Sequence, residues 1–404
     1  MAVPGHKPSI DAALQVTVSD IAAKVLGVFH LKDDCQVAAV RCQLEETSVI
    51  PNFDVHLLCG GRVLEDTDLL AAFQRDHHVE ITLLRSPQPC AVTGGSDGDF
   101  LVWNLRTGSC CRFLPFGETI TCLSIDWNAR IMLSGHADTI LRLWDLDRGV
   151  CLRELADGSI QSMLRCVEFN WNAKVAVSGC AAFASCCAFP KTNGATLALW
   201  DLASGRYIQG FGSCGVRSLS VDWTSPGSEH ALVNDDVHLR MFSLDSGCLL
   251  WEIASASPIQ AMAVDWPAQG AVTAGSSVIK VWKLHGPRCI QEFSCDCTHV
   301  QELAMDWTSR RCIASGIRSR GQRELFCWTW NFEDGQCLHE TFLGCGQLRC
   351  VAIDPYRQQC LCAMSDEDDN ELFGDVLKLY DSVEGQPMLV LEGHTDHVMC
   401  GVLS

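Results

Sequence analysis

The sequence predicts a mainly β protein, in which a small mixed unit precedes a ring of seven four-stranded units. Apolar runs that end in Asp-Trp, such as TCLSIDW and QAMAVDW, recur along the chain and are followed by further strand-like runs. A second set of aromatic residues recurs at intervals of 40 to 56 residues. The end of the chain, LEGHTDHVMCGVLS, is the beginning of one more unit, whose remainder stands at residues 90–114. Because an open ring leaves unpaired strand edges, we expect a C-terminal strand at Val398–Leu403 to close it.

The composition limits the classes of protein that fit. With 404 residues, 48% of them hydrophobic, the chain is long enough for more than one domain. A net charge of −19 argues against nucleic acid as the main ligand, because phosphate binding requires a basic surface. The start MAVPGHKPSIDAAL has no signal-peptide pattern, and the run 176–190 is too short and polar to span a membrane. We therefore expect a cytoplasmic or nuclear protein, with no membrane role, whose 25 cysteines are free thiols.

Residues 1–13 are expected to form a tail, and residues 14–85 the first folded unit. Within this unit Val37, Val40 and Leu44 have the spacing of one helix face, whereas alternating apolar residues indicate strands. The predicted order is strand, strand, helix, strand, strand, at residues 14–18, 25–31, 37–48, 57–58 and 79–83.

The stretch IPNFDVHLLCGGRVLED, residues 50–66, resembles ubiquitin, and the resemblance continues without gaps to about Arg85. It implies a ubiquitin-like β-grasp domain at residues 14–85. Where ubiquitin has its conjugating diglycine, this chain has Ser86-Pro87-Gln88-Pro89, which we expect to be a stiff linker at 86–89. The domain is therefore expected to be a built-in part of the protein. The resemblance places ubiquitin's protein-binding apolar patch, with threonine in place of its histidine, at Ile21, Leu58, Thr82 and Leu84.

Residues 90–404 resemble WD-repeat proteins in period and strand pattern, which implies a seven-bladed β-propeller with four strands in each blade. One aromatic ladder lies on the third strands: Trp103, Trp144, Trp200, Phe242, Trp282, Trp328 and Tyr380. A second ladder ends the first strands: Trp127, Trp171, Trp223, Trp266 and Trp307. The first blade keeps the polar set that forms a structural hydrogen-bond network in that family: Asp97, His394, Trp103 and Thr93.

Three units are lengthened between their second and third strands, at residues 180–195, 317–323 and 365–374. In a propeller these insertions share one rim, so we expect a client protein to bind there. We also expect the arginines of one insertion to pair with the acidic run of another, since exposed ion pairs are the ordinary use of such residues. Docking of a partner by the arginines is the alternative. The charged residues predicted on this rim are Arg318, Arg320, Arg323, Asp366, Glu367, Asp368 and Asp369.

Several patterns resemble catalytic or metal sites. Ser96 stands in GGSDG, which matches a nucleophile elbow, but that motif requires a following helix and a strand follows here. The Cys-x-Cys pairs at 295–297 and 360–362 are too closely spaced for paired zinc ligands, and the acidic run lacks the spacing of a calcium loop. We therefore expect no catalytic residue, metal or cofactor. An enzyme that uses Ser96 or a reactive thiol at Cys186-Cys187 is the weakest hypothesis.

The two resemblances together imply a non-enzymatic adaptor. The propeller would hold a client protein, and the ubiquitin-like domain would dock on a receptor of the ubiquitin–proteasome system or on an AAA ATPase. One alternative is a family of ribosome-assembly factors with the same order of domains. Another rests on Trp103-Asn104-Leu105-Arg106, which resembles the Trp-Asp-x-Arg box of WD-repeat substrate receptors of cullin-type ubiquitin ligases, with Asn104 in place of aspartate. We expect a monomer outside such complexes.

Overall fold

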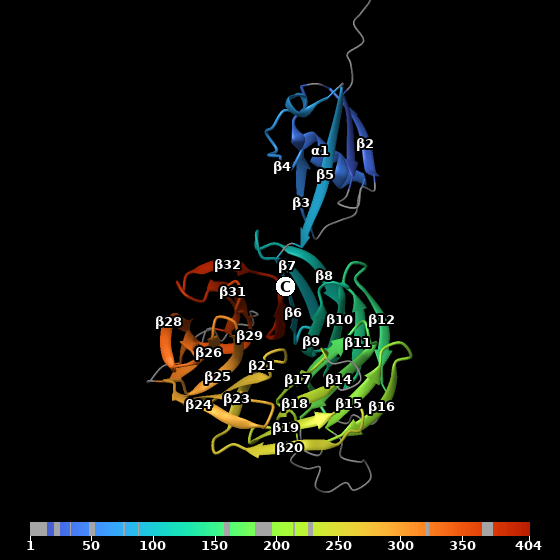
Figure 1. Cartoon of the computed structure of the whole chain (residues 1–404). Coiled ribbons are helices and arrows are strands. Elements are labelled where there is room, and N and C mark those ends of the chain that lie inside the picture. Colours follow the sequence, from blue (N-terminus) through green and yellow to red (C-terminus); the bar gives the residue numbers. More distant parts are fainter. Residues whose placement is uncertain are drawn as a thin grey trace, which may run out of the picture. The chain divides into compact units, whose positions relative to one another are not determined.

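The computed structural model describes residues 14–19, 25–32, 34–47, 53–75, 77–87, 89–156, 162–181, 196–212, 215–224, 229–319, 323–365 and 375–404. The chain divides into two compact units, Met1–Pro89 and Cys90–Ser404 (Figure 1). Strands dominate both units. Among the residues described, no helix is long and apolar enough to cross a membrane.

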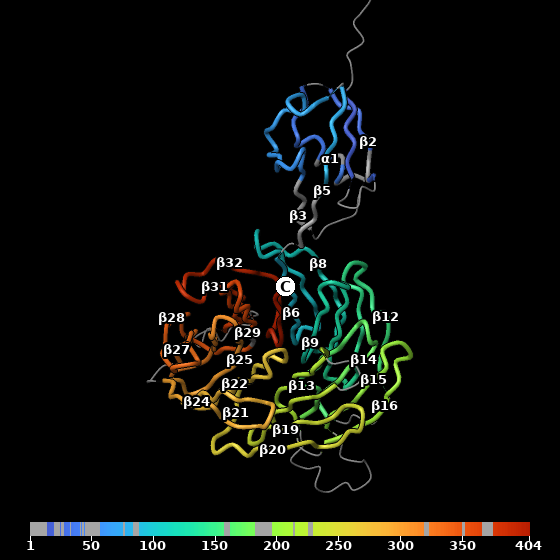
Figure 2. The backbone as a smooth tube through the Cα atoms, in the orientation of Figure 1, coloured from blue at the N-terminus to red at the C-terminus, as the bar shows by residue number. Residues whose placement is uncertain are grey.

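The first unit is a five-stranded sheet packed against the helix α1, Val37–Thr47 (Figure 2). The strand order is β2-β1-β5-β3-β4, with β1 and β5 parallel at the centre. Val37, Val40 and Leu44 of the helix share one buried core with the inward-facing residues of the sheet, such as Val16 and Ile81. The remaining elements are β1 (Leu14–Ser19), β2 (Val25–Leu31), β3 (Phe53–Cys59), β4 (Arg62–Val63), the 3-10 helix η1 (Leu70–Phe73) and β5 (His78–Pro87).

Strand β5 is longer than the sequence suggests. Ser86 pairs with Asp54 and Pro87 with Phe53, so the first two residues of the expected linker belong to the sheet. Of the other two, Gln88 lies outside the described residues, and the second unit begins directly after Pro89.

The second unit contains seven four-stranded antiparallel sheets among the residues described, and we call each sheet a blade. Blades 1 to 4 are β33 (Val398–Leu403), β6 (Cys90–Gly95), β7 (Asp99–Asn104), β8 (Cys110–Pro115); β9 (Ile120–Asp126), β10 (Ile131–His136), β11 (Leu141–Asp145), β12 (Val150–Leu155); β13 (Leu164–Asn170), β14 (Val175–Cys180), β15 (Leu197–Asp201), β16 (Arg206–Phe211); and β17 (Ser218–Val221), β18 (His230–Asn234), β19 (His238–Ser243), β20 (Leu249–Ala254).

Blades 5 to 7 continue in the same order along the chain. They are β21 (Ile259–Asp265), β22 (Gly270–Gly275), β23 (Val278–Lys283), β24 (Arg288–Ser294); β25 (His299–Asp306), β26 (Arg311–Ser319), β27 (Arg323–Asn331), β28 (Gln336–Cys345); and β29 (Gln347–Asp354), β30 (Gln359–Ser365), β31 (Val376–Asp381), β32 (Pro387–Leu391). A mainly β chain built of such sheets fits a WD-like β-propeller.

The outermost strand is the most exposed strand of each blade. All six residues of β10 are buried, whereas β12, the fourth strand of the same blade, is exposed until Leu155. A strand covered on both faces is mostly apolar, which explains the apolar runs of the second and third strands, and the buried polar residues in them, such as Thr93 and Ser134, are hydrogen-bonded. Neighbouring blades share their cores, as Leu133 and Leu143 of blade 2 do with Phe169 and Trp200 of blade 3.

A β-bulge precedes the ladder aromatic in the third strand of every blade, as it does before Trp144. In blade 6 this bulge lies before Trp330, which pairs with Cys312 as Trp144 pairs with Met132. The ladder residue of blade 6 is therefore Trp330, and the sequence prediction of Trp328 was wrong by two residues. Both tryptophans of CWTW face the same side of a strand, so the period alone does not separate them.

Blade 1 combines the two ends of the unit. Strand β33 pairs with β6 from Val398 opposite Gly95 to Leu403 opposite Ala91. The Ser404 amide donates to the Cys90 carbonyl at 2.9 Å, and the Trp127 indole of blade 2 donates to the Leu403 carbonyl at 3.1 Å. The core of blade 7 includes Val398, so β33 packs against blades on both of its sides.

Removal of residues 398–404 should destabilise the whole second unit, because β6 then becomes an unpaired edge and two neighbouring blades lose their shared core. We expect the melting temperature to fall by about 5 °C or more, or cooperative melting to disappear, in calorimetry. Met399→Ala is the matched control, since this side chain of β33 is exposed. If the shortened protein melts like the control, β33 is not needed for the fold.

Candidate interaction rim

Alternating strand directions give the second unit two rims. The turns between second and third strands lie on one, which we call the insertion rim because the three predicted insertions belong to it. The turns between first and second strands lie on the other, which we call the tryptophan rim after Trp127 and its equivalents. Most residues of the insertions (182–195, 320–322 and 366–374) lie outside the described part of the chain.

The four polar residues predicted in blade 1 are joined in one hydrogen-bonded chain. The Trp103 indole donates to Thr93 Oγ1 at 2.8 Å, and Thr93 Oγ1 lies 2.8 Å from His394 Nε2. His394 Nδ1 lies 2.9 Å from Asp97 Oδ2. Because the Asp97 carboxylate can only accept, Nδ1 of His394 carries the proton that faces it, and Nε2 of the neutral ring then accepts from the Thr93 hydroxyl.

This order of carboxylate, imidazole and hydroxyl resembles a catalytic triad, but its burial excludes that role. Thr93 is completely buried, and its hydroxyl already accepts the proton of an indole. No substrate atom can reach it, so the network fixes blade 1 and its Gly-His turn. Ser96 lies in a β-turn followed by β7, and its hydroxyl donates to the His397 carbonyl at 3.2 Å.

Blade 2 contains a similar network that the sequence prediction missed. The Trp144 indole donates to Ser134 Oγ at 2.8 Å, and Ser134 Oγ lies 2.8 Å from His136 Nε2. His136 comes from the end of β10 and not from a Gly-His turn, which is why the family pattern does not find it. A signal existed, because a hydroxyl residue stands ten positions before the ladder tryptophan in both blades.

Cations of the third strand face glutamates of the fourth strand in three blades. Arg142 pairs with Glu154 at 2.9 Å, and Lys280 pairs with Glu292 at 3.3 Å. In blade 4 the pair is Arg240 and Glu252. These positions are directly opposite each other in the strand register, so the pairs stabilise the outer half of each blade.

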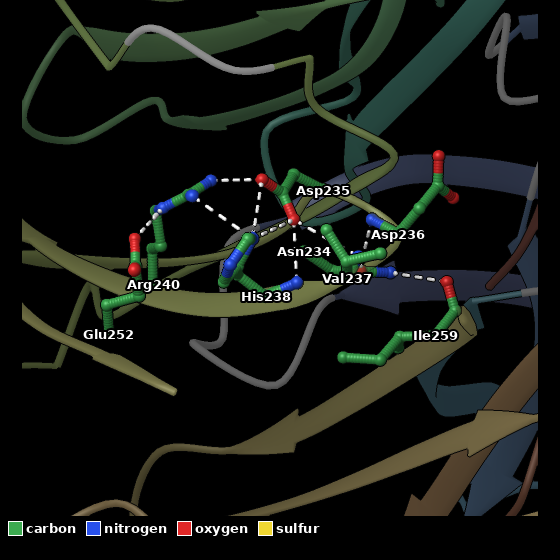
Figure 3. Close-up of polar contacts among 8 residues, drawn as sticks. All are labelled: Asn234, Asp235, Asp236, Val237, His238, Arg240, Glu252 and Ile259. Atoms are coloured by element: carbon green, nitrogen blue, oxygen red, sulfur yellow. Dashed lines mark hydrogen bonds and ion pairs between the residues drawn. The ribbon is translucent and has the colours of Figure 1, made fainter. Parts of the chain in front are cut away.

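The turn of blade 4 on the insertion rim carries a cluster of charged and polar residues (Figure 3). The buried Asp235 carboxylate accepts from the amide of His238 at 2.7 Å and from the guanidinium of Arg240. Burial alone would raise the pKa of Asp235, but these two donors hold that pKa below its usual value. Arg240 is also within 3.1 Å of the His238 ring and contacts Glu252. The cluster therefore holds one guanidinium between two carboxylates.

The same turn is tied to its neighbours. Asn234 is buried and donates to the carbonyl of Ile259 in blade 5 at 3.2 Å (Figure 3). Asp236 accepts from Arg217 at 2.9 Å, and Arg217 also donates to the carbonyl of Gln260 at 2.8 Å. The polar surface of the insertion rim at blades 4 and 5 is thus preorganised by the chain's own contacts.

A cavity of about 430 Å³ opens beside this cluster, in the seam between blades 3 and 4. Its inner wall is apolar, with Phe211 and Phe242 inclined to each other 5.6 Å apart. Asp235, Arg240 and Glu252 form its charged side. An apolar pocket with a few oriented polar groups is the usual form of a binding site. Its full lining is Thr196, Leu197, Phe211, Gly212, Val216, Val233, Asp235, Arg240, Phe242, Gly247, Leu249 and Glu252.

Arg318 differs from the exposed rim residue that the sequence suggests. It is 7% exposed, makes two 2.7 Å hydrogen bonds to Glu340, and donates to the Asp296 carbonyl at 3.0 Å. The reason is that β26 and β27 extend the sheet to the pair Ser319–Arg323, so Arg318 lies over blade 6 and not in a loop. Its guanidinium stacks on Phe326. Arg323 is exposed, whereas Arg320, Asp366, Glu367, Asp368 and Asp369 lie outside the described residues.

The structure describes the side chains of two of the four residues in the predicted patch of the first unit. Leu58 and Thr82 are directly opposite each other on β3 and β5, half-buried and exposed respectively. The adjacent Leu57 and Leu83 are buried in the core, so the alternation of the strands directs Leu58 and Thr82 to the other face. Ile21 and the side chain of Leu84 lie outside the description.

The cysteine pairs are buried. The sulfur atoms are 2.8 Å apart in Cys295/Cys297 and 3.3 Å apart in Cys360/Cys362. Burial raises the pKa of Cys312, which packs near the first pair, to about 12, so that thiol remains protonated. Within the described ranges no group of three His, Cys, Asp or Glu residues is arranged to hold a metal ion. Cys186-Cys187 lies outside them.

Comparison with known proteins finds no matching family model. Over 69 residues, the chain is 35% identical to striatin-4 of Mus musculus and 33% identical to striatin-4 of Homo sapiens. This stretch covers 17% of the chain and only 9% of either relative. The crystal structure of the computationally designed Ika8 protein matches with a TM-score of 0.53 and 20% identity, over 77% of this chain and 86% of that one. The similarity to a WD-repeat protein and the repeated sheets support a WD-like β-propeller.

Acidification tests the network of blade 2. Burial, and then the nearby Arg142, lowers the pKa of His136 from 6.5 to about 4. The unfolded chain binds a proton near pH 6.5 that the folded chain does not, so this contribution is present above pH 6.5 and is lost as the pH falls towards 4. His136→Gln should flatten this part of the stability curve by up to about 3 kcal/mol, measured by urea unfolding. An unchanged curve would contradict the assignment.

Arg318→Ala should destabilise the second unit by about 1–2 kcal/mol, because it removes both hydrogen bonds to Glu340, whose side chain is 44% exposed, and the stacking on Phe326. The exposed Arg323→Ala is the matched control and should change stability by no more than about 0.5 kcal/mol. Urea unfolding of both variants measures the difference. Equal effects would show that Arg318 is an ordinary surface residue.

Proposed function

We propose that this protein is a non-enzymatic interaction scaffold, in which the seven blades form one ring closed by β33. The observation that carries the proposal is the cavity and polar cluster of blade 4 on the insertion rim. Its charged groups are held by fixed hydrogen bonds, as suits a surface that recognises another protein. The partial similarity to striatin-4, a WD-repeat scaffold protein, supports the same function. A client protein would bind on the insertion rim.

The first unit would then dock the scaffold on a second protein. Leu58 and Thr82 lie side by side on the sheet face that does not cover the core, where the sequence resemblance places ubiquitin's binding patch. A receptor of the ubiquitin–proteasome system, or an AAA ATPase, is the partner that this resemblance implies. Action in the cytoplasm or nucleus, as a monomer outside its complexes, belongs to the same proposal. We further propose that no metal, cofactor or nucleic acid takes part.

One observation favours a second candidate, a substrate receptor of a cullin-type ligase. Asn104 accepts from the amide of Arg106 at 2.8 Å, as Asp145 accepts from the amide of Asp147 at 3.0 Å. The asparagine therefore caps its turn as an aspartate does, and its presence in the Trp-Asp-x-Arg-like box leaves the local backbone unchanged. Ribosome assembly has no specific support here beyond the order of units.

The proposal predicts that Leu58→Asp abolishes capture of the docking partner and leaves the client bound. A charge at the centre of an apolar patch removes its contribution to binding, while the alternation of β3 keeps the residue out of the core. Affinity purification of the full chain, analysed by mass spectrometry, measures both sets of partners. Val28→Asp, at a residue 46% exposed in the same unit, is the control.

The melting temperature decides how a negative result is interpreted. If Leu58→Asp unfolds the first unit, Leu58 belongs to the core and the ubiquitin-based assignment is wrong. If the variant folds and keeps every partner, the patch is not the docking surface. A full chain that captures the same partners after Asp235→Asn and Glu252→Gln together would contradict client binding at blade 4.

A further inference from the structure

We infer that the seam between blades 3 and 4 also binds an arginine side chain of a partner protein, on the tryptophan rim. A second cavity, of about 270 Å³, opens there. It combines an indole, two carboxylates and an apolar wall. Its lining is Val175, Leu199, Ile208, Gln209, Trp223, Glu229, Leu244 and Asp245.

The seam between blades 1 and 2 shows what such a site holds. There the Arg130 side chain lies over the Trp127 ring, 5.7 Å from its centre, and pairs with Asp147 at 3.2 Å. It also hydrogen-bonds to the thiol of Cys90 and acts electrostatically on Cys111. The side chain of Arg130 is only 13% exposed. In that seam the chain supplies its own arginine.

The strand register shows that the two seams have equivalent positions. Cys90 and Val175 both begin the second strand, opposite the residue after the ladder tryptophan. Cys111 and Ile208 both follow the residue that faces this tryptophan from the fourth strand. Asp245, like Asp147, comes three residues after its ladder aromatic. The residues that line the cavity therefore stand at the same register positions as the residues that surround Arg130 in the other seam.

Glu229 stands at the register position of Arg130, but without the positive φ of Arg130, which is 56°. The Arg130 carbonyl accepts from the amide of Leu146 at 2.9 Å, and the Glu229 carbonyl accepts from the amide of Leu244 at 2.9 Å. The same backbone bond identifies the equivalent residue in the other blades, where it is basic in two and glutamine in two: Lys174, Arg310, Gln269 and Gln358. Blade 4 alone, among these described positions, has an acid there. The seam of blade 4 thus has two carboxylates, Glu229 and Asp245, where the seam of blade 2 has one cation, Arg130, and one carboxylate, Asp147.

The indole of this site is held in place. The carboxyl of Glu168, in blade 3, hydrogen-bonds to the Trp223 indole and accepts from the Val221 amide at 2.9 Å. Burial raises the pKa of Glu168 to about 8, so at neutral pH it is largely protonated and adds little charge. Gln209 is held by its bond to the Leu244 carbonyl at 2.6 Å. The site is preorganised, which lowers the entropy cost of binding.

Guanidinium fits this set of groups better than other ligands. Its plane stacks on an indole and its edge donates to carboxylates, while its methylene stem packs on apolar walls such as Leu199 and Ile208. Phosphates and anionic lipids are disfavoured by Glu229 and Asp245. The net charge of −19 attracts basic partners over longer distances. The occupant is therefore an arginine on an extended segment of another protein.

This inference deepens the scaffold proposal, on which it rests, because it names the chemistry of one contact. Failure of the arginine site and failure of the scaffold proposal give different experimental results. A small peptide tests the cavity alone, whereas the scaffold proposal depends on capture of whole partners by the insertion rim and the first unit.

The probe is the capped peptide acetyl-Gly-Arg-Gly-amide, titrated into the full chain, with the Trp223 indole N–H resonance as the readout. We expect a saturable shift, and binding at least about tenfold weaker for the counterpart with citrulline, which has the same shape without the charge. Equal binding of the two peptides, or no shift of the Trp223 resonance, would overturn the inference.

Two substitutions test the internal comparison. Glu229→Arg should fill the cavity as Arg130 fills its seam, and so abolish peptide binding without lowering the melting temperature. A variant that folds and still binds the peptide would overturn the equivalence of the two positions. If Glu229→Arg does not fold, Asp245→Asn decides, and should weaken binding about fivefold or more. Asp147→Asn, the equivalent change in blade 2, is the control and should leave binding unchanged; equal effects of the two changes would contradict the site.

Discussion

The pairing of β33 with β6 is the constraint on which the second unit depends. It supplies blade 1 with its inner strand, and it places His394 beside Asp97 and Thr93. Without this register the imidazole would have no partner inside the blade. The cores shared with the blades on both sides also include residues of β33, so this short strand helps β6 and β7 to join blade 7 to blade 2.

The blades differ in how they provide a hydrogen-bond acceptor for the buried aromatic residue of the third strand. Each third strand has a buried aromatic residue that follows a β-bulge, and a buried indole N–H requires an acceptor. Trp103, Trp144, Trp200 and Trp282 each donate to a serine or threonine of the second strand. Phe242 needs no acceptor, and its blade borders both cavities. Blades 6 and 7 also depart from this scheme, since Trp328 in the third strand of blade 6 donates to Glu340 and Tyr380 to the Leu343 carbonyl, but the two cavities described above lie in the seam between blades 3 and 4.

Periodicity made the architecture predictable, because a strand covered on both faces is mostly apolar and the same residue types recur in each repeat. The assignment of Trp328 failed where two tryptophans satisfied the same period. Arg318 could not be placed, since its burial depends on two strands that extend beyond the usual blade. His136 and Glu229 could be interpreted only after the register showed which positions correspond. The exchange of a cation for an acid at Glu229 is plain in the sequence, but its meaning comes from comparison with Arg130 in space.

The assembly of blade 1 from both ends of the unit also affects how the protein folds. Thr93 and His394 are 301 residues apart in sequence, so their contact forms against a large loss of chain entropy. During synthesis, β6, β7 and β8 are made before the other blades, and they lack β33 until all six of those blades have also been made. A long-range pairing of this kind is slow, and an unpaired β6 is open to other nascent chains meanwhile. The second unit should therefore complete its folding only after β33 has been synthesised, and cells with depleted chaperones should accumulate it as aggregates.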